Sequence, residues 1–260
     1  MIDLAGASAV AASEGTACSI QLGTQVRDIH IGDTTRRFWI GAGRRVSAGG
    51  AAPIVFLWHG WGSNPLSILR RFDSERLWPD AIVVAPEGVA RRIQGLGMSR
   101  HRGWQLTTGE FDDRDLRLFD AILETLLGEG CVDSKRVYSA GFSNGGFFSN
   151  LLGCRRPDAI AAIASVAGGG PDAPPCGEPV PVLITHGTSD PVVPYGSGKE
   201  SFRRWRAENG CEGQPARAAT SCVEATGCRA PVTFCSFSGG HGWPGGTSRR
   251  IVEFLRSQRK

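Results

Sequence analysis

The sequence predicts an α/β protein with a mostly parallel central sheet and helices on both faces of that sheet. Short apolar runs rich in β-branched residues recur along the chain, among them 53–58 (PIVFLW) and 81–85 (AIVVA). Such continuous apolar runs are typical of strands that are covered on both faces. Segments with helical periodicity lie between the runs, and this alternation favours a parallel sheet.

The expected strands follow from these runs in chain order, beginning with a pair of strands near the amino end. We expect strands at residues 26–31, 37–40, 53–58, 81–85, 136–140, 160–166, 180–185 and 232–237. No internal repeat or low-complexity linker interrupts the series.

Apolar stripes between the strands predict four helices. The first stripe lies between 116 and 127, behind an acidic start at Asp112 and Asp113, and acidic side chains suit the positive end of a helix dipole. Further stripes fall at 147–152, at 202–205 and at 251–255.

Length and charge narrow the class further. The 260 residues suit one large α/β domain, which we place at 18–260, with 1–17 as an N-terminal tail or processing remnant. The net charge of +4 is small and the arginines are spread along the chain, so we expect no nucleic-acid partner. No apolar run reaches the roughly 20 residues that span a bilayer, so we expect no membrane partner.

Cysteine usage predicts the redox compartment. An even number of cysteines at this density indicates disulfides, an oxidising compartment and hence secretion. A metal site is the alternative, but the sequence has no Cys-x-x-Cys pair and no His at zinc-ligand spacing from a Cys, so we expect neither metal nor cofactor. The eight candidates are Cys18, Cys131, Cys154, Cys176, Cys211, Cys222, Cys228 and Cys235.

A G-x-S-x-G pattern at 141–145 supplies a candidate nucleophile, Ser143. The pattern follows an expected strand and precedes an expected helix, which is the strand–turn–helix setting of the nucleophile elbow in the α/β-hydrolase fold. The small residues Gly141 and Gly145 would permit the tight turn. The alternative is a glycine-rich turn with a capping serine.

A serine nucleophile needs a base and an acid that orients the base. His241 lies between the last expected strand and the last expected helix, where this fold places its base. Asp190 follows the expected strand at 180–185 and is the preferred acid, with Asp172 as its rival. We expect His186 to be structural.

Backbone N–H groups should stabilise the oxyanion of an acyl-transfer intermediate. We expect one donor from Asn144, directly after the nucleophile, and the other from Trp61, in the loop after the strand at 53–58. His59 in the same loop has two possible roles, a structural one or a functional one. The rings of Trp61, Trp104 and Trp243 lie in segments that should reach the same edge of the sheet, where they either stack on a substrate or pack in the core or at the rim of the site.

Together these segments resemble the carbohydrate-esterase family that groups feruloyl esterases, acetylxylan esterases and polyhydroxybutyrate depolymerases. The resemblance rests on 59–62 (HGWG), 103–104 (GW), 136–146 (RVYSAGFSNGG), 186–195 (HGTSDPVVPY) and 240–245 (GHGWPG). It implies the same Ser143, Asp190 and His241 triad.

The segments 131–133 (CVD), 227–228 (GC) and 234–235 (FC) are similar to the cysteine-rich feruloyl esterase branch. This similarity implies that Cys18 pairs with Cys131 and Cys154 with Cys176. It also implies that the other four cysteines form two bridges near the histidine loop.

We therefore expect a secreted, monomeric serine esterase whose partner is its ester substrate, with a feruloyl (hydroxycinnamoyl) ester of plant cell-wall polysaccharide as the expected substrate. A polyhydroxybutyrate or other polyester depolymerase and an acetylxylan esterase are alternatives with the same chemistry. A serine peptidase or a non-catalytic binding protein on the same fold is a remoter interpretation.

Overall fold

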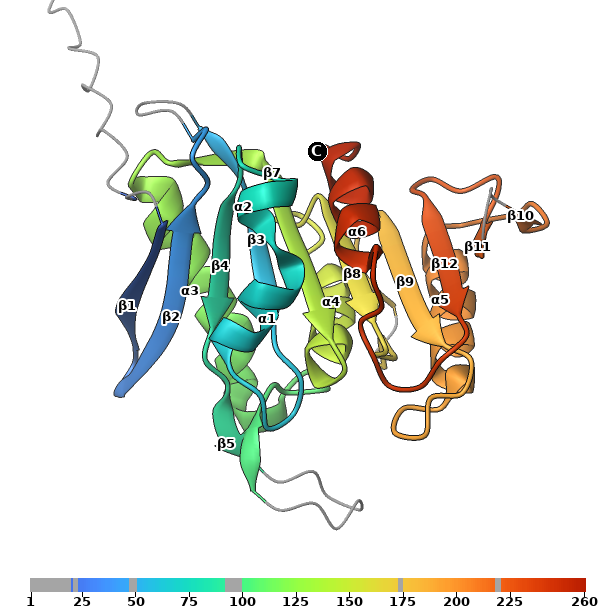
Figure 1. Cartoon of the computed structure of the whole chain (residues 1–260), viewed down its shortest axis with the longest axis horizontal. Coiled ribbons are helices and arrows are strands. Elements are labelled where there is room, and N and C mark those ends of the chain that lie inside the picture. Colours follow the sequence, from blue (N-terminus) through green and yellow to red (C-terminus); the bar gives the residue numbers. More distant parts are fainter. Residues whose placement is uncertain (1–19, 21–22, 47–50, 92–99, 173–174, 218–220) are drawn as a thin grey trace, which may run out of the picture.

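The computed structural model describes residues 20, 23–46, 51–91, 100–172, 175–217 and 221–260, with the side chain of residue 217 left out. Its centre is a ten-stranded sheet with the order β1-β2-β4-β3-β7-β8-β9-β12-β11-β10 (Figure 1). These strands are β1 (Gly23–Ile31), β2 (Thr34–Ala42), β3 (Ala52–Trp58), β4 (Ile82–Pro86), β7 (Val132–Phe142), β8 (Ala162–Val166), β9 (Val182–Gly187), β10 (Ala216–Arg217), β11 (Cys222–Glu224) and β12 (Val232–Phe237).

The six central strands, from β4 to β12, run parallel, and antiparallel strands flank them on both sides. The expected pair of strands near the amino end is confirmed as the β1–β2 hairpin. A separate two-stranded sheet pairs β5 (Val89–Arg91) with β6 (His101–Gly103).

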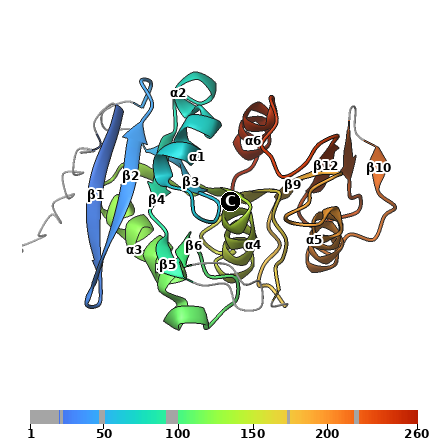
Figure 2. The ribbon, with the colours of Figure 1, turned by 60° about the horizontal axis from the view of Figure 1, so that its bottom comes forward.

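Helices cover both faces of the sheet, as predicted (Figure 2). One face carries α3 (Arg114–Gly128), α4 (Asn144–Arg155) and α5 (Tyr195–Glu208). The other carries α1 (Pro65–Phe72), α2 (Ser74–Leu77) and α6 (Thr247–Arg256). The 3-10 turn Glu110–Asp113 precedes α3, so the two predicted acidic residues lie ahead of that helix rather than in its first turn.

Strand β3 shows why the central runs are apolar throughout. Phe56 and Trp58 point into the core beneath α3 and α4, whereas Val55 and Leu57 point into the core beneath α1 and α6. Successive side chains of a strand alternate between faces, so a strand covered on both faces must be apolar at every position. Every residue of β3 is buried, as this requires.

Helix α1 was not predicted. It has eight residues, begins at Pro65 and is capped by Asn64, whose side-chain oxygen accepts a hydrogen bond of 3.0 Å from the backbone N–H of Ser67. Only Ile68 and Phe72 continue its buried face, so its apolar signal is too short to be read from the sequence.

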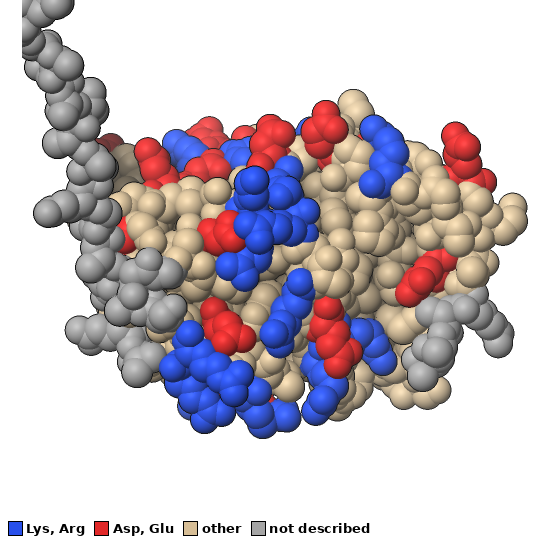
Figure 3. Space-filling model, turned by 90° about the horizontal axis from the view of Figure 1, so that it is seen from above, with Lys and Arg blue, Asp and Glu red and all other residues tan. Residues whose placement is uncertain are grey.

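Because the central strands are parallel, their carboxyl ends share one edge, the lower edge in Figure 1. The loop from β3 into α1 and the loop from β12 into α6 both reach this edge. Figure 3 views the opposite edge, where basic and acidic side chains are interspersed. A ligand site is expected at the carboxyl edge in sheets of this kind.

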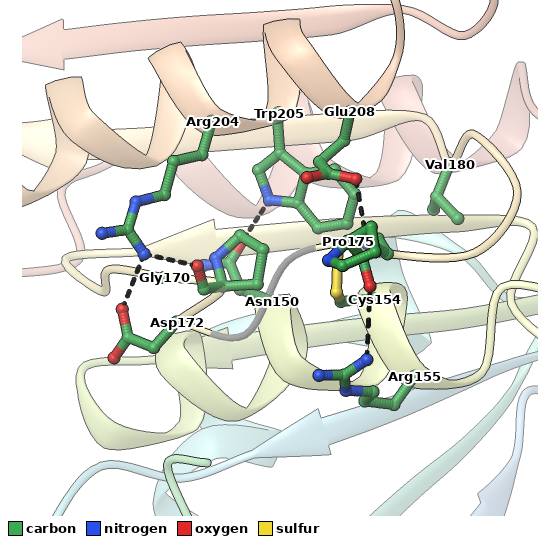
Figure 4. Close-up of a disulfide and its surroundings, with 12 residues drawn as sticks. Asn150, Cys154, Arg155, Gly170, Asp172, Pro175, Val180, Arg204, Trp205 and Glu208 are labelled. Atoms are coloured by element: carbon green, nitrogen blue, oxygen red, sulfur yellow. Dashed lines mark hydrogen bonds and ion pairs between the residues drawn. A yellow bond between two sulfur atoms is a disulfide. The ribbon is translucent and has the colours of Figure 1, made fainter. Parts of the chain in front are cut away.

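Among the described residues, three disulfides tie the carboxyl half of the chain together. The predicted bridge between Cys154 and Cys176 is confirmed, and it anchors the segment after β8 to α4 (Figure 4). The other predicted pair of bridges is confirmed as Cys211–Cys228 and Cys222–Cys235. Cys18 lies outside the described residues, so its pairing with Cys131 stays a prediction. Across the described ranges no helix is long and apolar enough to cross a membrane.

Candidate active site

Ser143 occupies a sharp turn between β7 and α4. Its φ of 55° and ψ of −120° lie in a region that non-glycine residues rarely adopt and that costs about 1–3 kcal/mol. The turn is held by a 2.8 Å hydrogen bond from the Ser143 N–H to the carbonyl of Val166. A second bond of 2.8 Å joins the Ser143 carbonyl to the N–H of Gly146. The side chain is thereby fixed at the carboxyl edge of the sheet.

Two glycines make this turn sterically feasible. A Cβ atom at Gly141 would lie 2.0 Å from the carbonyl oxygen of Gly145, and one at Gly145 would lie 2.1 Å from the carbonyl oxygen of Trp58. Backbone atoms cannot yield at such distances, so both positions require glycine. The G-x-S-x-G pattern is therefore explained by the close approach of α4 to the ends of β3 and β7.

The structure brings Ser143, His241 and Asp190 into one hydrogen-bonded row. His241 Nε2 lies 2.8 Å from Ser143 Oγ, and His241 Nδ1 lies 2.7 Å from Asp190 Oδ2. An ionised Asp190 can only accept, so Nδ1 carries the proton and Nε2 is left to accept from the serine hydroxyl. These are the contacts that activate a serine for attack on a carbonyl.

Asp190 is held rigidly from its other side. Its Oδ1 accepts 2.9 Å hydrogen bonds from the backbone N–H groups of Val192 and Val193. Burial alone would raise the pKa of Asp190, but the hydrogen bonds from His241 and the two N–H groups outweigh it and lower this pKa below its usual value. Asp190 is therefore a carboxylate that both orients His241 and can stabilise its protonated form.

Buried His186 lies behind Asp190, consistent with the predicted structural role. Its Nε2 lies 2.9 Å from the carbonyl oxygen of Val193 and 3.5 Å from Asp190 Oδ2. Burial lowers the pKa of His186, so the ring is neutral and donates to Val193.

The rival acid, Asp172, points elsewhere. It forms a 3.0 Å ion pair with Arg204 on α5, beside the Cys154–Cys176 disulfide (Figure 4). Asp190, not Asp172, contacts His241.

A cleft of about 310 Å³ opens beside Ser143. Its wall combines apolar and hydroxyl side chains with two histidines and one arginine. The lining residues are His59, Gly60, Trp61, Ser63, Ser67, Ile68, Arg71, Phe142, Ser143, Val192 and His241. This volume lies near the lower end of the roughly 300–1,000 Å³ typical of small-molecule sites.

The two predicted oxyanion donors lie on segments next to Ser143. Asn144 is the first residue of α4, and the N–H groups of a helix's first turn have no acceptor within the helix. Trp61 lines the cleft, and a Cβ atom at its neighbour Gly60 would lie 3.4 Å from Ser143 Cβ. The loop after β3 thus packs against the nucleophile.

His59 is a scaffold residue. It is buried, its Nδ1 lies 2.8 Å from the Gly60 carbonyl oxygen, and its Nε2 accepts a 3.0 Å hydrogen bond from the N–H of Gly88. Burial lowers the pKa of His59 to about 4, so the ring is neutral and ties the loop after β3 to the segment after β4.

The three tryptophans expected at this edge occupy different places. Trp104 is fully buried, stacks on Phe148 and donates its indole N–H to the His59 carbonyl, so the prediction that it binds substrate is wrong. Its backbone forms two hydrogen bonds with the Asn144 side chain: the Trp104 N–H donates to Asn144 Oδ1, and Asn144 Nδ2 donates to the Trp104 carbonyl. Of the three rings, Trp61 lines the cleft.

Trp243 packs behind the cleft rather than in its wall. Its ring lies 6.3 Å from that of Phe142, edge to face, and its indole N–H donates to Ser248. Phe142 rather than Trp243 lines the cleft there, and substrate contact by Trp243 stays a prediction. The sequence analysis did not predict that Phe142 and Arg71 line the cleft, although Phe142 occupies the x position directly before Ser143 in the G-x-S-x-G pattern.

Comparisons with known proteins agree with this site. No family model matches the chain. The chain is 32% identical over 202 residues to a probable feruloyl esterase C of Aspergillus flavus, covering 72% of this chain and 69% of that protein. Feruloyl esterase C of Emericella nidulans is 32% identical over 205 residues, with the same coverages. The chain belongs to the feruloyl esterase family.

Solved structures support the fold of this esterase independently. The acetyl xylan esterase from Aspergillus awamori superposes with a TM-score of 0.67 at 16% identity, covering 89% of this chain and 99% of that one. At this identity the likeness concerns the fold alone, which is that of the α/β-hydrolases. The esterase is a serine carboxylic ester hydrolase by its family, and its substrate is an ester.

Proposed function

We propose that this chain hydrolyses feruloyl and related hydroxycinnamoyl esters with Ser143 as nucleophile, His241 as base and Asp190 as orienting acid. The observation that carries the proposal is the unbroken row of hydrogen bonds from Asp190 through His241 to Ser143, beside a cleft walled by Phe142 and Trp61. A flat aromatic acyl group fits such a wall because aromatic rings pack favourably against one another.

Acylation begins when Ser143 Oγ attacks the ester carbonyl carbon and its proton passes to His241 Nε2. The carbonyl oxygen becomes an oxyanion, which the backbone N–H groups of Trp61 and Asn144 stabilise. The carbon–oxygen bond to the alcohol then breaks, and His241 gives its proton to the departing alcohol oxygen. The product is an ester between the acyl group and Ser143.

Deacylation repeats these steps with water. His241 takes a proton from a water molecule as its oxygen attacks the acyl carbonyl carbon. The bond to Ser143 Oγ breaks, His241 returns the proton to that oxygen, and the free acid leaves. Throughout, Asp190 stays ionised and stabilises the imidazolium form of His241. Each step uses groups of this chain and water.

Three disulfides among the described cysteines are typical of proteins that work in an oxidising compartment. We infer that the enzyme is secreted and acts as a monomer on ester-linked hydroxycinnamates of plant cell-wall polysaccharides.

The test is a side-by-side assay on methyl ferulate, acetylated xylan and a hydroxybutyrate oligomer, with rates expressed per active site. We expect the highest kcat/KM on methyl ferulate, and at least a thousandfold loss in Ser143→Ala. Ser257→Ala is the matched control, because its exposed hydroxyl lies outside the cleft, donates to the carbonyl of Phe254 and accepts from the side chain of Gln258. A highest rate on either other substrate would overturn the assignment of substrate, and an active Ser143→Ala would overturn the mechanism.

A further inference from the structure

Arg71 is a cation in the wall of the catalytic cleft that the mechanism does not use. It belongs to the last turn of α1, and its side chain is exposed. The guanidinium carbon lies 5.0 Å from the centre of the Phe142 ring, and the same ring lies 5.0 Å from the His241 ring. Phe142 precedes Ser143 in the chain, so this cation stands within reach of a substrate held there.

Arg71 differs in its partners from many of the described arginines. Arg36, Arg91 and Arg156, for example, each form an ion pair with a carboxylate. Within the described part of the chain, no carboxylate or carbonyl oxygen accepts a hydrogen bond from the Arg71 side chain, and no Asp or Glu lines the cleft. The five N–H donors of its guanidinium are therefore available to a ligand.

The backbone beneath Arg71 is fixed. Its carbonyl accepts a 2.6 Å hydrogen bond from Ser248 on α6, and Ser248 in turn accepts a 3.0 Å bond from the indole N–H of Trp243. The Phe142 ring supports the guanidinium from below through a cation–π contact. A guanidinium placed in this way loses little freedom when it forms a planar, two-pronged bond to a carboxylate.

Resting on the proposed ester hydrolysis, we propose that Arg71 determines specificity by binding a carboxylate on the substrate. The preferred substrates are aromatic esters that carry a free carboxylate near the scissile bond. The carboxylate has two sources with the same chemistry, which are an acyl group with a second acid function and an acidic sugar or other acidic alcohol.

Two matched pairs of esters separate these sources. For the acyl arm, the methyl ester of 4-carboxycinnamic acid is compared with that of 4-carbamoylcinnamic acid. For the alcohol arm, the ferulate ester of glycolic acid is compared with that of glycolamide. Each pair differs by a carboxylate against a neutral amide of similar shape, so the ratio of the two kcat/KM values isolates the charge.

In one of the two arms we expect kcat/KM to be about tenfold higher for the carboxylate ester than for the amide ester, because a hydrogen-bonded ion pair contributes about that much to binding. The preference should fall toward one in Arg71→Gln and should persist in Arg70→Gln, whose exposed side chain is on the same helix end but outside the cleft. It should also weaken in 0.5 M salt, because salt screens exposed charges.

A wild-type enzyme that turns over methyl ferulate but prefers the amide, or neither ester, in both arms would overturn the role of Arg71 while leaving the proposed function intact. An Arg71→Gln variant that loses activity equally on both members of each pair would show that Arg71 only supports Phe142, which also overturns the proposal. A wild-type enzyme that does not hydrolyse methyl ferulate would instead contradict the proposed function.

Discussion

Two buried aspartates, Asp190 and Asp115, show how one kind of side chain serves chemistry in one place and folding in another. Asp115 is fully buried on α3 and pairs at 3.0 Å with the guanidinium of Arg36, a partner that is always charged. Asp190 lies on a loop at the carboxyl edge of the sheet and bonds to His241, a partner that can gain and lose a proton.

The other hydrogen bonds of the two aspartates differ in the same way. The second oxygen of Asp115 accepts from the backbone N–H of Gln105, whose side chain in turn accepts from the N–H of Asp115. Asp115 thus closes a ring of contacts within the core. The oxygen of Asp190 that bonds to His241 starts a row that ends at Ser143 in an open cleft. A titratable partner and access to the cleft distinguish the catalytic carboxylate, whereas burial does not.

The largest expected effect tests this contrast at Asp190. Asp190→Asn should lower kcat by a factor on the order of 10⁴, because an amide no longer holds the productive tautomer of His241. Steady-state kinetics on methyl ferulate measures this loss. Urea unfolding should show only a small change in the free energy of unfolding.

Asp115→Asn is the matched control, with the opposite expectation. Removing the charge leaves Arg36 buried without its partner, which should cost roughly 3–5 kcal/mol of stability. The folded fraction should retain most of its kcat. If Asp115→Asn lost kcat like Asp190→Asn, or if the two stability effects were reversed, the distinction between the two carboxylates would be contradicted.

A smaller effect should distinguish the scaffold histidine His59 from the catalytic His241. It concerns the pH dependence of the free energy of unfolding. The pKa of His59 is about 4 in the folded protein, against 6.5 for an ordinary histidine. Between these values the unfolded chain binds a proton that the folded chain does not, so the free energy of unfolding should rise with pH from about 4 to 6.5. The shift corresponds to about 3 kcal/mol over that window.

His59→Gln should flatten this dependence by about that amount, and urea unfolding at several pH values measures it. His186, whose pKa is also lowered, contributes with the same sign, so the wild type must be compared with the variant rather than with a flat line. An unchanged slope in His59→Gln would contradict the scaffold role of His59.

Sequence reasoning succeeded where the local pattern has one physical explanation. The central strands are apolar at every position because both of their faces are covered, and the glycines around Ser143 have no tolerable substitute beside β3. The order of Ser143, Asp190 and His241 along the chain follows from the topology of the sheet.

The errors concern side chains whose place depends on tertiary packing. Trp104 and Trp61 both follow a glycine in loops at the same edge, yet Trp104 is clamped by Asn144 into the core while Trp61 lines the cleft. Nothing near Arg71 in the sequence shows that α1 places it over Phe142. Such contacts join residues far apart in the chain, so no local pattern records them.

Covalent trapping of the nucleophile tests the central claim most directly. A fluorophosphonate reagent loses fluoride to an activated serine and leaves a phosphonyl group on its oxygen, which peptide mass spectrometry locates. We predict one adduct, on Ser143, formed in step with the loss of esterase activity, and none in Ser143→Ala. An adduct on Ser63 or Ser67 in the same cleft, or full inactivation with Ser143 unmodified, would contradict the account.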